Sequence, residues 1–280
     1  MRNTRSKPTF TALVLAGDRG TDDPLVAKAG VACKALVEIN GKPMVLHVLD
    51  TLQSADPVSR CILSGPERSQ LKGQHRIENQ ISNNQLDWIK PEKTPSTSAY
   101  VAMQSIPEDQ PILLTTADHP LLTADIVNSF CSLSLKKEAD VTVALCRYEL
   151  IKSTFPGMKK TVLKFSDGEY CGCNLFSFLT PNSRELANKW RQVEDDRKNP
   201  LRVIKLLGWF SVLRYMTGTL SLNDAMRRLS RKLGLRISII DMPFAEAAVD
   251  VDSISDQKIV QAHLASSKLS GGKENTKVVE

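Results

Sequence analysis

Short apolar runs alternate with helix-patterned segments along the first half of the chain. Four runs predict strands: "FTALVLA", "SRCILSG", "PILLTTAD" and "ADVTVALCRY". Between them, "KPMVLHVLDTL", "STSAYVAMQSI" and "LTADIVNSFCSL" have the apolar spacing of helices. Strands that are apolar throughout are typical of a parallel sheet covered on both faces. The pattern therefore predicts a three-layer α/β/α fold with a mostly parallel central sheet, whose ligands bind beyond the carboxyl ends of the strands.

The pattern changes after about residue 160. The Asp167-Gly168 pair predicts the turn of a hairpin, and "NSRELANKWRQV", "PLRVIKLLGWFSVLRYM" and "SLNDAMRRLSRKLG" predict three helices. A strand, "LRISIID", an extended segment, "AVDVDS", and a final helix, "DQKIVQAHL", follow. We expect one domain over 8–265 with a helical insert over about 182–234, and a disordered tail over 266–280.

Composition excludes several classes of protein. The formal net charge of +6 is modest, and no interleaving of basic and aromatic residues favours nucleic-acid binding. The six cysteines show no zinc-binding spacing and are expected to be reduced thiols of a cytoplasmic protein. The first residues lack a secretory-signal pattern, and no apolar run is long enough to predict a spanning helix.

A long polar segment follows the first predicted strand. Gly17 and Gly20 would allow close approach to a ligand, and three basic side chains could neutralise phosphates: Arg19, Lys28 and Lys34. A glycine-rich, cationic loop at this place is typical of a phosphate-binding site. The alternative is a disordered surface loop.

Aspartates at two later positions are candidate metal ligands. Asp118 ends an apolar strand and could bind Mg²⁺ together with substrate phosphates, or it could cap the following helix. Asp250 and Asp252 alternate along an extended segment, so both are expected to point the same way and to complete a magnesium site with Asp118. Asp252 could instead cap the last helix. His119 is expected to be a solvated or hydrogen-bonded neighbour rather than a ligand.

These segments together resemble the MobA-like nucleoside triphosphate transferase family. Its signature is an "LAGGxGxRxxxxK" loop, an aspartate that ends an apolar strand, and a late "DxDTxED" segment. The corresponding stretches here are "LAGDRGTDDPLVAKAGVACKAL", "TTADHPLL" and "VDVDSISDQ". The match covers about residues 10–145 and returns over about 235–265. Asp18 stands where the family usually has a second glycine, and the spacing to Lys34 is longer than typical.

The resemblance implies a Rossmann-like, glycosyltransferase-A-like fold of the nucleotide-diphospho-sugar transferase type. It implies catalytic roles for Lys34, Arg19 and Asp118 and a Mg²⁺ cofactor held by Asp118, Asp250 and Asp252. The implied nucleotide-binding residues are Leu15, Ala16, Gly17, Asp18, Gly20, Lys34, Thr94, Ser98 and Asp118. Gly172 and Asn174 lie where relatives contact the second substrate.

The predicted function is magnesium-dependent transfer of a nucleoside monophosphate from a nucleoside triphosphate to a small phosphorylated acceptor, with release of pyrophosphate. One alternative is a non-catalytic nucleotide-binding regulatory protein that has kept the fold. A glycosyltransferase is a further alternative, although such enzymes usually carry a mid-chain DxD sequence. The basic, amphipathic insert could contact an anionic membrane, but packing of a helical subdomain against the sheet is the favoured interpretation.

Overall fold

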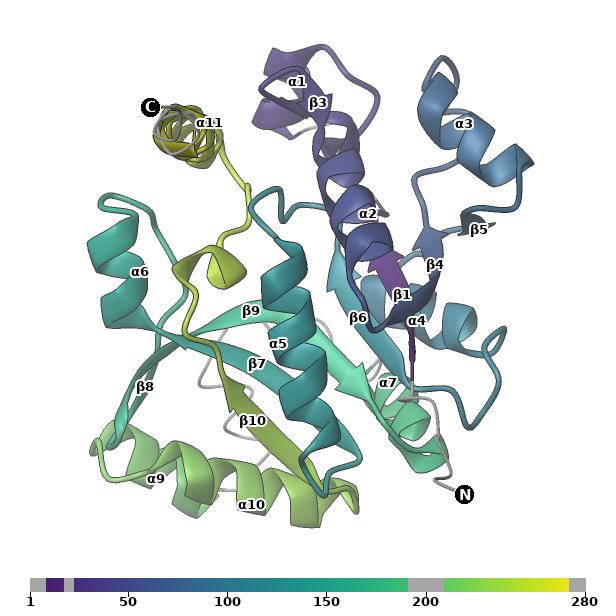
Figure 1. Cartoon of the computed structure of the whole chain (residues 1–280). Coiled ribbons are helices and arrows are strands. Elements are labelled where there is room, and N and C mark those ends of the chain that lie inside the picture. Colours follow the sequence, from purple (N-terminus) through teal and green to yellow (C-terminus); the bar gives the residue numbers. More distant parts are fainter. Residues whose placement is uncertain (1–8, 18–22, 191–208, 272–280) are drawn as a thin grey trace, which may run out of the picture.

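The computed structural model describes residues 9–17, 23–190 and 209–271, and it has a central sheet with helices on both faces (Figure 1). The strands of the sheet are β1 (Phe10–Leu15), β4 (Val58–Ser64), β5 (Asp87–Ile89), β6 (Ile112–Thr116), β7 (Val141–Arg147), β8 (Leu163–Phe165), β9 (Gly168–Phe178) and β10 (Ile237–Asp241). A separate two-stranded hairpin is formed by β2 (Glu38–Ile39) and β3 (Lys42–Pro43).

The described α-helices are α1 (Pro24–Ala29), α2 (Met44–Ser54), α3 (His75–Ser82), α4 (Pro95–Met103), α5 (Ala124–Leu135), α6 (Tyr148–Thr154), α7 (Arg184–Trp190), α9 (Trp209–Met216), α10 (Leu222–Leu233) and α11 (Ile254–Gly271). Short 3₁₀ turns include η1 (Lys34–Leu36) and η4 (Ala245–Ala248). None of the described helices has the length and apolar character needed to span a membrane.

The strand order of the sheet is β10-β7-β9-β6-β1-β4-β5, with β8 paired to β9. Strand β1 lies between β4 and β6 and is parallel to both. Strand β9 is antiparallel to its two neighbours, β6 and β7, and also to β8, to which the turn at Asp167-Gly168 joins it. The predicted mostly parallel sheet is confirmed, and β9 is its antiparallel member.

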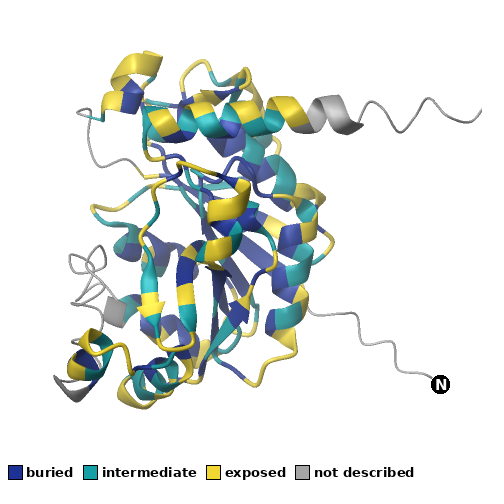
Figure 2. Cartoon of the chain, turned by 90° about the vertical axis from the view of Figure 1, so that its left-hand side faces the viewer, coloured by how far each residue is buried: buried dark blue, intermediate teal, exposed yellow. Residues whose placement is uncertain are grey.

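The two faces of the sheet are covered by different helices. Along β1 and β4, Val14 and Leu63 pack into the cluster that contains α2 and α5, whereas Leu13 and Ile62 pack into the cluster that contains α4. Successive side chains of a strand point to opposite faces, so strands buried on both faces must be apolar throughout. The buried interior of the sheet is visible in Figure 2. The predicted three-layer architecture is confirmed.

Among the described helices of the predicted insert, α7 packs against α4, and α10 packs against the edge strand β10. In α10, Leu222 and Ala225 are buried, and Ser221 caps the helix by accepting a hydrogen bond of 3.1 Å from the backbone N–H of Asp224. In α9, by contrast, Leu213 and Met216 are 49% and 70% exposed. Residues 191–208, which are part of the predicted insert, lie outside the described residues.

Two segments differ from the sequence-based expectation. The polar segment after β1 contains helix α1, which is capped by Asp23 and ends at Gly30 in the left-handed conformation. Asp-Pro before a helix and glycine after it are common boundary signals, but six helical residues are too few to show a clear periodicity. At the other end, α11 continues to Gly271, beyond the start of the predicted tail, and residues 272–280 lie outside the described part.

Gly65 allows the ends of β1 and β4 to approach closely. Its φ is +82°, and a Cβ atom there would lie 2.9 Å from the backbone nitrogen of Gly17 and 3.1 Å from the carbonyl carbon of Ala16. Because these neighbours are backbone atoms, they cannot rotate away as a flexible side chain could. A glycine is therefore required at this position.

Gly65→Ala is expected to destabilise the protein by about 1–3 kcal/mol more than Gly73→Ala, because the added methyl group overpacks the backbone of residues 16–17. Gly73 is the matched control, since its φ is +83° and a Cβ atom there would meet nothing within 4 Å. Urea unfolding of the two variants measures the difference. Equal losses would show that the close approach has no energetic consequence.

Candidate functional site

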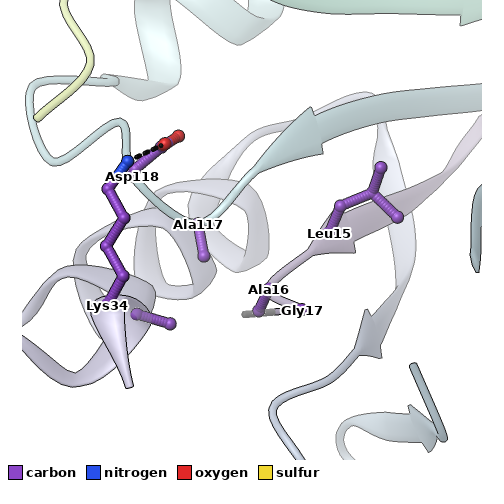
Figure 3. Close-up of a pocket in the computed structure, with 7 residues that line it drawn as sticks. Leu15, Ala16, Gly17, Lys34, Ala117 and Asp118 are labelled. Carbon is purple, nitrogen blue, oxygen red and sulfur yellow. Dashed lines mark hydrogen bonds and ion pairs between the residues drawn. The ribbon is translucent and has the colours of Figure 1, made fainter. Parts of the chain in front are cut away.

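A pocket opens at the carboxyl ends of β1 and β6 (Figure 3). These strands are parallel neighbours, with Leu15 opposite Thr116, so the segments that follow them emerge at the same edge of the sheet. The pocket is lined by Leu15, Ala16, Gly17, Lys34, Ala35, Ala117 and Asp118. This is the edge at which open α/β sheets bind ligands.

Lys34 connects two of the predicted aspartates. Its Nζ atom lies 2.8 Å from Asp118 Oδ2 and 2.5 Å from Asp252 Oδ1. The lysine belongs to the 3₁₀ turn η1, whose Ala35 and Leu36 are buried, so the side chain begins from a fixed backbone position. Figure 3 shows it extending across the mouth of the pocket to Asp118. Two carboxylates from distant parts of the chain thus share one ammonium group.

Asp118 is held by groups on both sides. Thr116 donates a hydrogen bond of 2.6 Å from its Oγ1 atom to Asp118 Oδ1, while Lys34 occupies the other carboxylate oxygen. The Asp118 carbonyl accepts a hydrogen bond of 3.0 Å from the backbone N–H of Val251. This last bond attaches the segment that carries Asp250 and Asp252 directly to the end of β6.

The pKa values of Lys34 and Asp118 reflect this arrangement. Burial is the largest single influence and disfavours the charged form of both groups, but the nearby opposite charges and the hydrogen bonds together outweigh it. The pKa of Asp118 is therefore lowered to about 2, helped by the hydrogen bond from Thr116. The pKa of Lys34 is raised because Asp118 and Asp252 both favour its ammonium form. Both groups are charged at neutral pH.

Asp250 is paired differently from Asp252. It forms an ion pair with Lys160, and its Oδ2 atom accepts a hydrogen bond of 3.3 Å from Asn174 Nδ2. Within the described residues, no group of three or more histidine, cysteine or acidic side chains is arranged to hold a metal ion. Asp250 thus has a different lysine partner from Asp118 and Asp252, which share Lys34; the three-carboxylate magnesium site stays a prediction.

His119 and Asn174 lie between the two ion pairs. The His119 ring is 1% exposed, and its Nε2 atom is 2.9 Å from Asn174 Nδ2. Burial lowers the pKa of His119, and four charged groups act on it as well: Asp118, Asp250, Lys160 and Lys34. The sequence suggested a solvated or hydrogen-bonded neighbour of Asp118, and the structure shows the hydrogen-bonded alternative, with the ring buried.

The other predicted site residues have varied surroundings. Thr94 caps α4 by accepting a hydrogen bond from the Thr97 N–H, and the Ser98 hydroxyl accepts one of 2.8 Å from the Glu92 N–H. Both therefore hold the loop after β5, and neither lines the pocket. Gly172 is exposed on β9. Asp18, Arg19 and Gly20 lie outside the described residues.

Sequence reasoning missed two groups near the site. Gly65 follows β4 in "SGP", a turn signal that was available but gave no hint of its contact with Gly17. Lys160 precedes the β8–β9 hairpin and has no local motif at all, because its partner Asp250 comes from a distant segment. Only the fold reveals that pair.

The donor set at Lys34 fits a divalent cation. Asp118 and Asp252 offer hard carboxylate oxygens on either side of a position now taken by an ammonium group, and Mg²⁺ prefers such oxygens in combination with substrate phosphates. The Lys34, Asp118 and Asp252 charges sum to −1. The excess negative charge favours binding of a cation.

This fold and pocket define a nucleotide-binding transferase of the α/β class. The model of the MobA-like NTP transferase domain matches residues 12–206. The chain belongs to that family, which confirms the predicted resemblance, the fold class and the assignment to the nucleotidyltransferases. Among solved structures, a hypothetical transferase from Thermus thermophilus is 27% identical with a TM-score of 0.72, covering 89% of this chain and 99% of that one.

More distant relatives carry defined names. The molybdenum cofactor guanylyltransferase of Vibrio cholerae is 28% identical over 149 residues, which are 51% of this chain and 66% of that protein. The bifunctional protein GlmU of Legionella pneumophila is 28% identical over 112 residues, which are 39% of this chain and 23% of that protein. A CMP:2-keto-3-deoxy-manno-octonic acid synthetase structure, solved with CTP, shares the fold at 13% identity and a TM-score of 0.57, covering 93% of this chain and 100% of that one.

The lowered pKa of Asp118 predicts a pH-dependent contribution to stability. Its ordinary value of 3.8 falls to about 2 in the folded protein, so its ionised form stabilises the native state above the unfolded-state pKa. That stabilisation, about 2 kcal/mol, is expected to disappear as the pH falls from about 4 to 2. Urea unfolding of the wild type and Asp118→Asn across this range should show curves that converge at low pH. A difference that is constant with pH would contradict the ion pair.

Proposed function

We propose that this protein transfers a nucleoside monophosphate from a nucleoside triphosphate to a small phosphorylated acceptor and releases pyrophosphate. The observation that carries the proposal is the position of Lys34 between Asp118 and Asp252 at the mouth of a pocket formed by the ends of β1 and β6. Family membership supports the use of a nucleoside triphosphate. The base and the acceptor are left to experiment.

The residues of the pocket have distinct tasks in this proposal. Ala16 and Gly17 line the pocket, and a nucleotide would lie beside their backbone. Lys34 would neutralise negative charge on the phosphates, and Asp118 and Asp252 would hold Mg²⁺. When bound, that ion would supply further charge neutralisation for the triphosphate.

The reaction requires no strong general base. A phosphate oxygen of the acceptor is already ionised near neutral pH, attacks the α-phosphorus, and displaces pyrophosphate. The protein mainly has to align the two substrates and stabilise the charge that develops between them. His119 is not needed for proton transfer, which agrees with its burial and its hydrogen bond to Asn174.

Measurements of nucleotide binding and of turnover distinguish a nucleotidyltransferase from a nucleotide-binding regulator that has lost activity. A ligand that binds the native state raises the apparent melting temperature. Each of the four nucleoside triphosphates with Mg²⁺ should be screened in this way, and the one that stabilises the protein then tested for pyrophosphate release with a panel of sugar, polyol and cofactor phosphates. Stabilisation without release from any acceptor would favour the regulator.

Asp118→Asn and Lys34→Met are each expected to lower the rate of pyrophosphate release by about a hundredfold or more. Lys34→Met removes a positive charge that would face the phosphates, and Asp118→Asn removes a carboxylate that would hold Mg²⁺. The matched control is Asp50→Asn. Asp50 is also an aspartate with two basic partners, Lys42 and Arg76, but it lies on α2 away from the pocket. Unchanged turnover in Asp118→Asn, with normal turnover in the control, would remove Asp118 from the mechanism.

The compartment that we propose for this activity is the cytoplasm. All six cysteines are described, and all are buried free thiols. Cys146 and Cys171 lie opposite each other on β7 and β9 as thiols, which is compatible with a reducing environment.

Peripheral membrane contact through the helical insert is not part of the proposed function. The apolar side of α10 is used in packing, since Leu222 and Ala225 are buried. In the part of α9 whose side chains are described, Leu213 and Met216 are the largely exposed apolar residues. We expect no co-flotation with vesicles that contain anionic phosphatidylserine. Co-flotation that is lost on changing Leu213 and Met216 to serine would contradict this expectation.

A further inference from the structure

The Lys160–Asp250 ion pair is unexplained by the nucleotide pocket. Neither residue lines that pocket, yet the Lys160 side chain is only 8% exposed and the Asp250 side chain 21%. Removing a lysine from water is costly unless its charge is used. An ordinary surface ion pair would not need this degree of burial, so the pair requires a specific explanation.

A defined network places this pair beside the Lys34 cluster. The amide nitrogen of Asn174 contacts both His119 Nε2 and Asp250 Oδ2. Because a carboxylate only accepts hydrogen bonds, this nitrogen must donate one proton to Asp250 and can donate the other to a neutral His119. His119 is next to Asp118, and Asp250 is two residues from Asp252. The two ion pairs are therefore neighbours linked through fixed polar contacts.

The charges of the two groups differ in a way that suits different ligands. Lys34 faces two carboxylates, so that cluster carries an excess negative charge and favours a cation. Lys160 faces one carboxylate, and the pair is neutral. An ammonium group has three donors, and among the described residues the acceptor found for Lys160 is a single oxygen, Asp250 Oδ1. Lys160 therefore retains the capacity to donate hydrogen bonds to an anion.

Strand β9 contributes residues beside the Lys160–Asp250 pair. Asn174 and Gly172 belong to β9, and a Cβ atom added at Gly172 would meet nothing within 4 Å. Strand β9 lies on the side of β6 away from β1, so this region borders Asp118 from the side opposite the nucleotide pocket. A molecule here would face the phosphates of a nucleotide bound over Gly17 and Lys34.

We propose that Lys160 binds the phosphate group of a phosphate-monoester acceptor, and that Asp250 positions Lys160 instead of binding the metal ion. The inference rests on the proposed nucleotidyl transfer and assigns the second half of the same site. The two aspartates of "DVD" then serve different substrates: Asp252 acts with Lys34 at the nucleotide, and Asp250 acts with Lys160 at the acceptor.

Steady-state kinetics test this division with the acceptor found in the screen. Lys160→Met is expected to raise the KM for the acceptor about tenfold or more, because a charge-assisted hydrogen bond is lost, while the KM for the nucleotide stays unchanged. Lys160→Arg should restore much of the acceptor affinity. Lys164→Met is the matched control, since Lys164 forms an exposed ion pair with Glu169 on the same hairpin. A KM for the acceptor that is the same in Lys160→Met and the control would overturn the proposal.

Asp250 and Asp252 are distinguished by their response to magnesium. Asp250→Asn should raise the KM for the acceptor and leave the Mg²⁺ concentration for half-maximal activity unchanged. Asp252→Asn should increase that concentration. Equal increases in both variants would overturn the positioning role of Asp250.

A binding measurement that needs no turnover provides a second test of the role of Lys160. Inorganic phosphate is the probe, and EDTA is present so that no metal contributes. Lys34→Met is used as the background to weaken phosphate binding at the nucleotide pocket, and calorimetry compares it with Lys34→Met/Lys160→Met. The added substitution should raise the Kd for phosphate about tenfold. If the Lys160→Met variant fails to fold, the double variant Lys160→Met/Asp250→Asn is used in its place, because it removes both charges of the ion pair.

The kinetic and binding experiments together distinguish failure of the Lys160 assignment from failure of the proposed nucleotidyl transfer. Weaker phosphate binding without any detectable turnover would leave the anion site standing and refute nucleotidyl transfer. Turnover that is insensitive to Lys160, together with an unchanged phosphate Kd, would leave nucleotidyl transfer standing and refute the assignment of Lys160.

Discussion

The shared ammonium group of Lys34 is the interaction on which the site depends. Asp118 and Asp252 would repel each other if they faced one another without a cation, and the lysine sits within hydrogen-bond distance of both. The three residues come from a turn near the start of the chain, the end of β6 and the segment before the last helix. One charge cluster therefore joins segments that are far apart in sequence. Removing Lys34 would leave two facing carboxylates uncompensated, whereas removing either aspartate would leave a neutral pair, so the lysine is the partner that the cluster cannot lose.

The sheet determines where this cluster can form. Parallel pairing of β1 with β4 and β6 places three strand ends at one edge, and the glycine at position 65 lets two of them meet without a gap. The backbone bond from Val251 to the Asp118 carbonyl then fixes the late acidic segment against β6. Helix α11 continues from that segment and packs, through Val260, in the same cluster as Leu25 of α1 and Ile39 of β2. The hydrophobic core thereby holds both sides of the charged site in place.

Local sequence patterns and the family resemblance predicted the main strands and part of the site. The apolar strands follow from burial on both faces, and Thr123 was recognisable as the cap of α5. Lys34 and Asp118 could be proposed because each stands at the end of a recognisable motif. Alternation predicted that Asp250 and Asp252 would share one direction, but it could not predict that different lysines would pair with them, because those partners are set by tertiary contacts. Lys160 gave no local signal for the same reason. Short elements such as α1, α3 and α6 contain too few residues for periodicity to identify them.

The reversed direction of β9 has a consequence for how such a protein can diversify. Because β9 runs against β6 and β7, the β8–β9 turn and the residues around Gly172 belong to one contiguous hairpin, separate from the segments that form the Lys34 cluster. Changes in length or composition within that hairpin can reshape one half of the cleft while the other half is conserved. Under the proposed function, acceptor preference could therefore change through edits to this single stretch of chain, while the segments that form the Lys34 cluster stay the same.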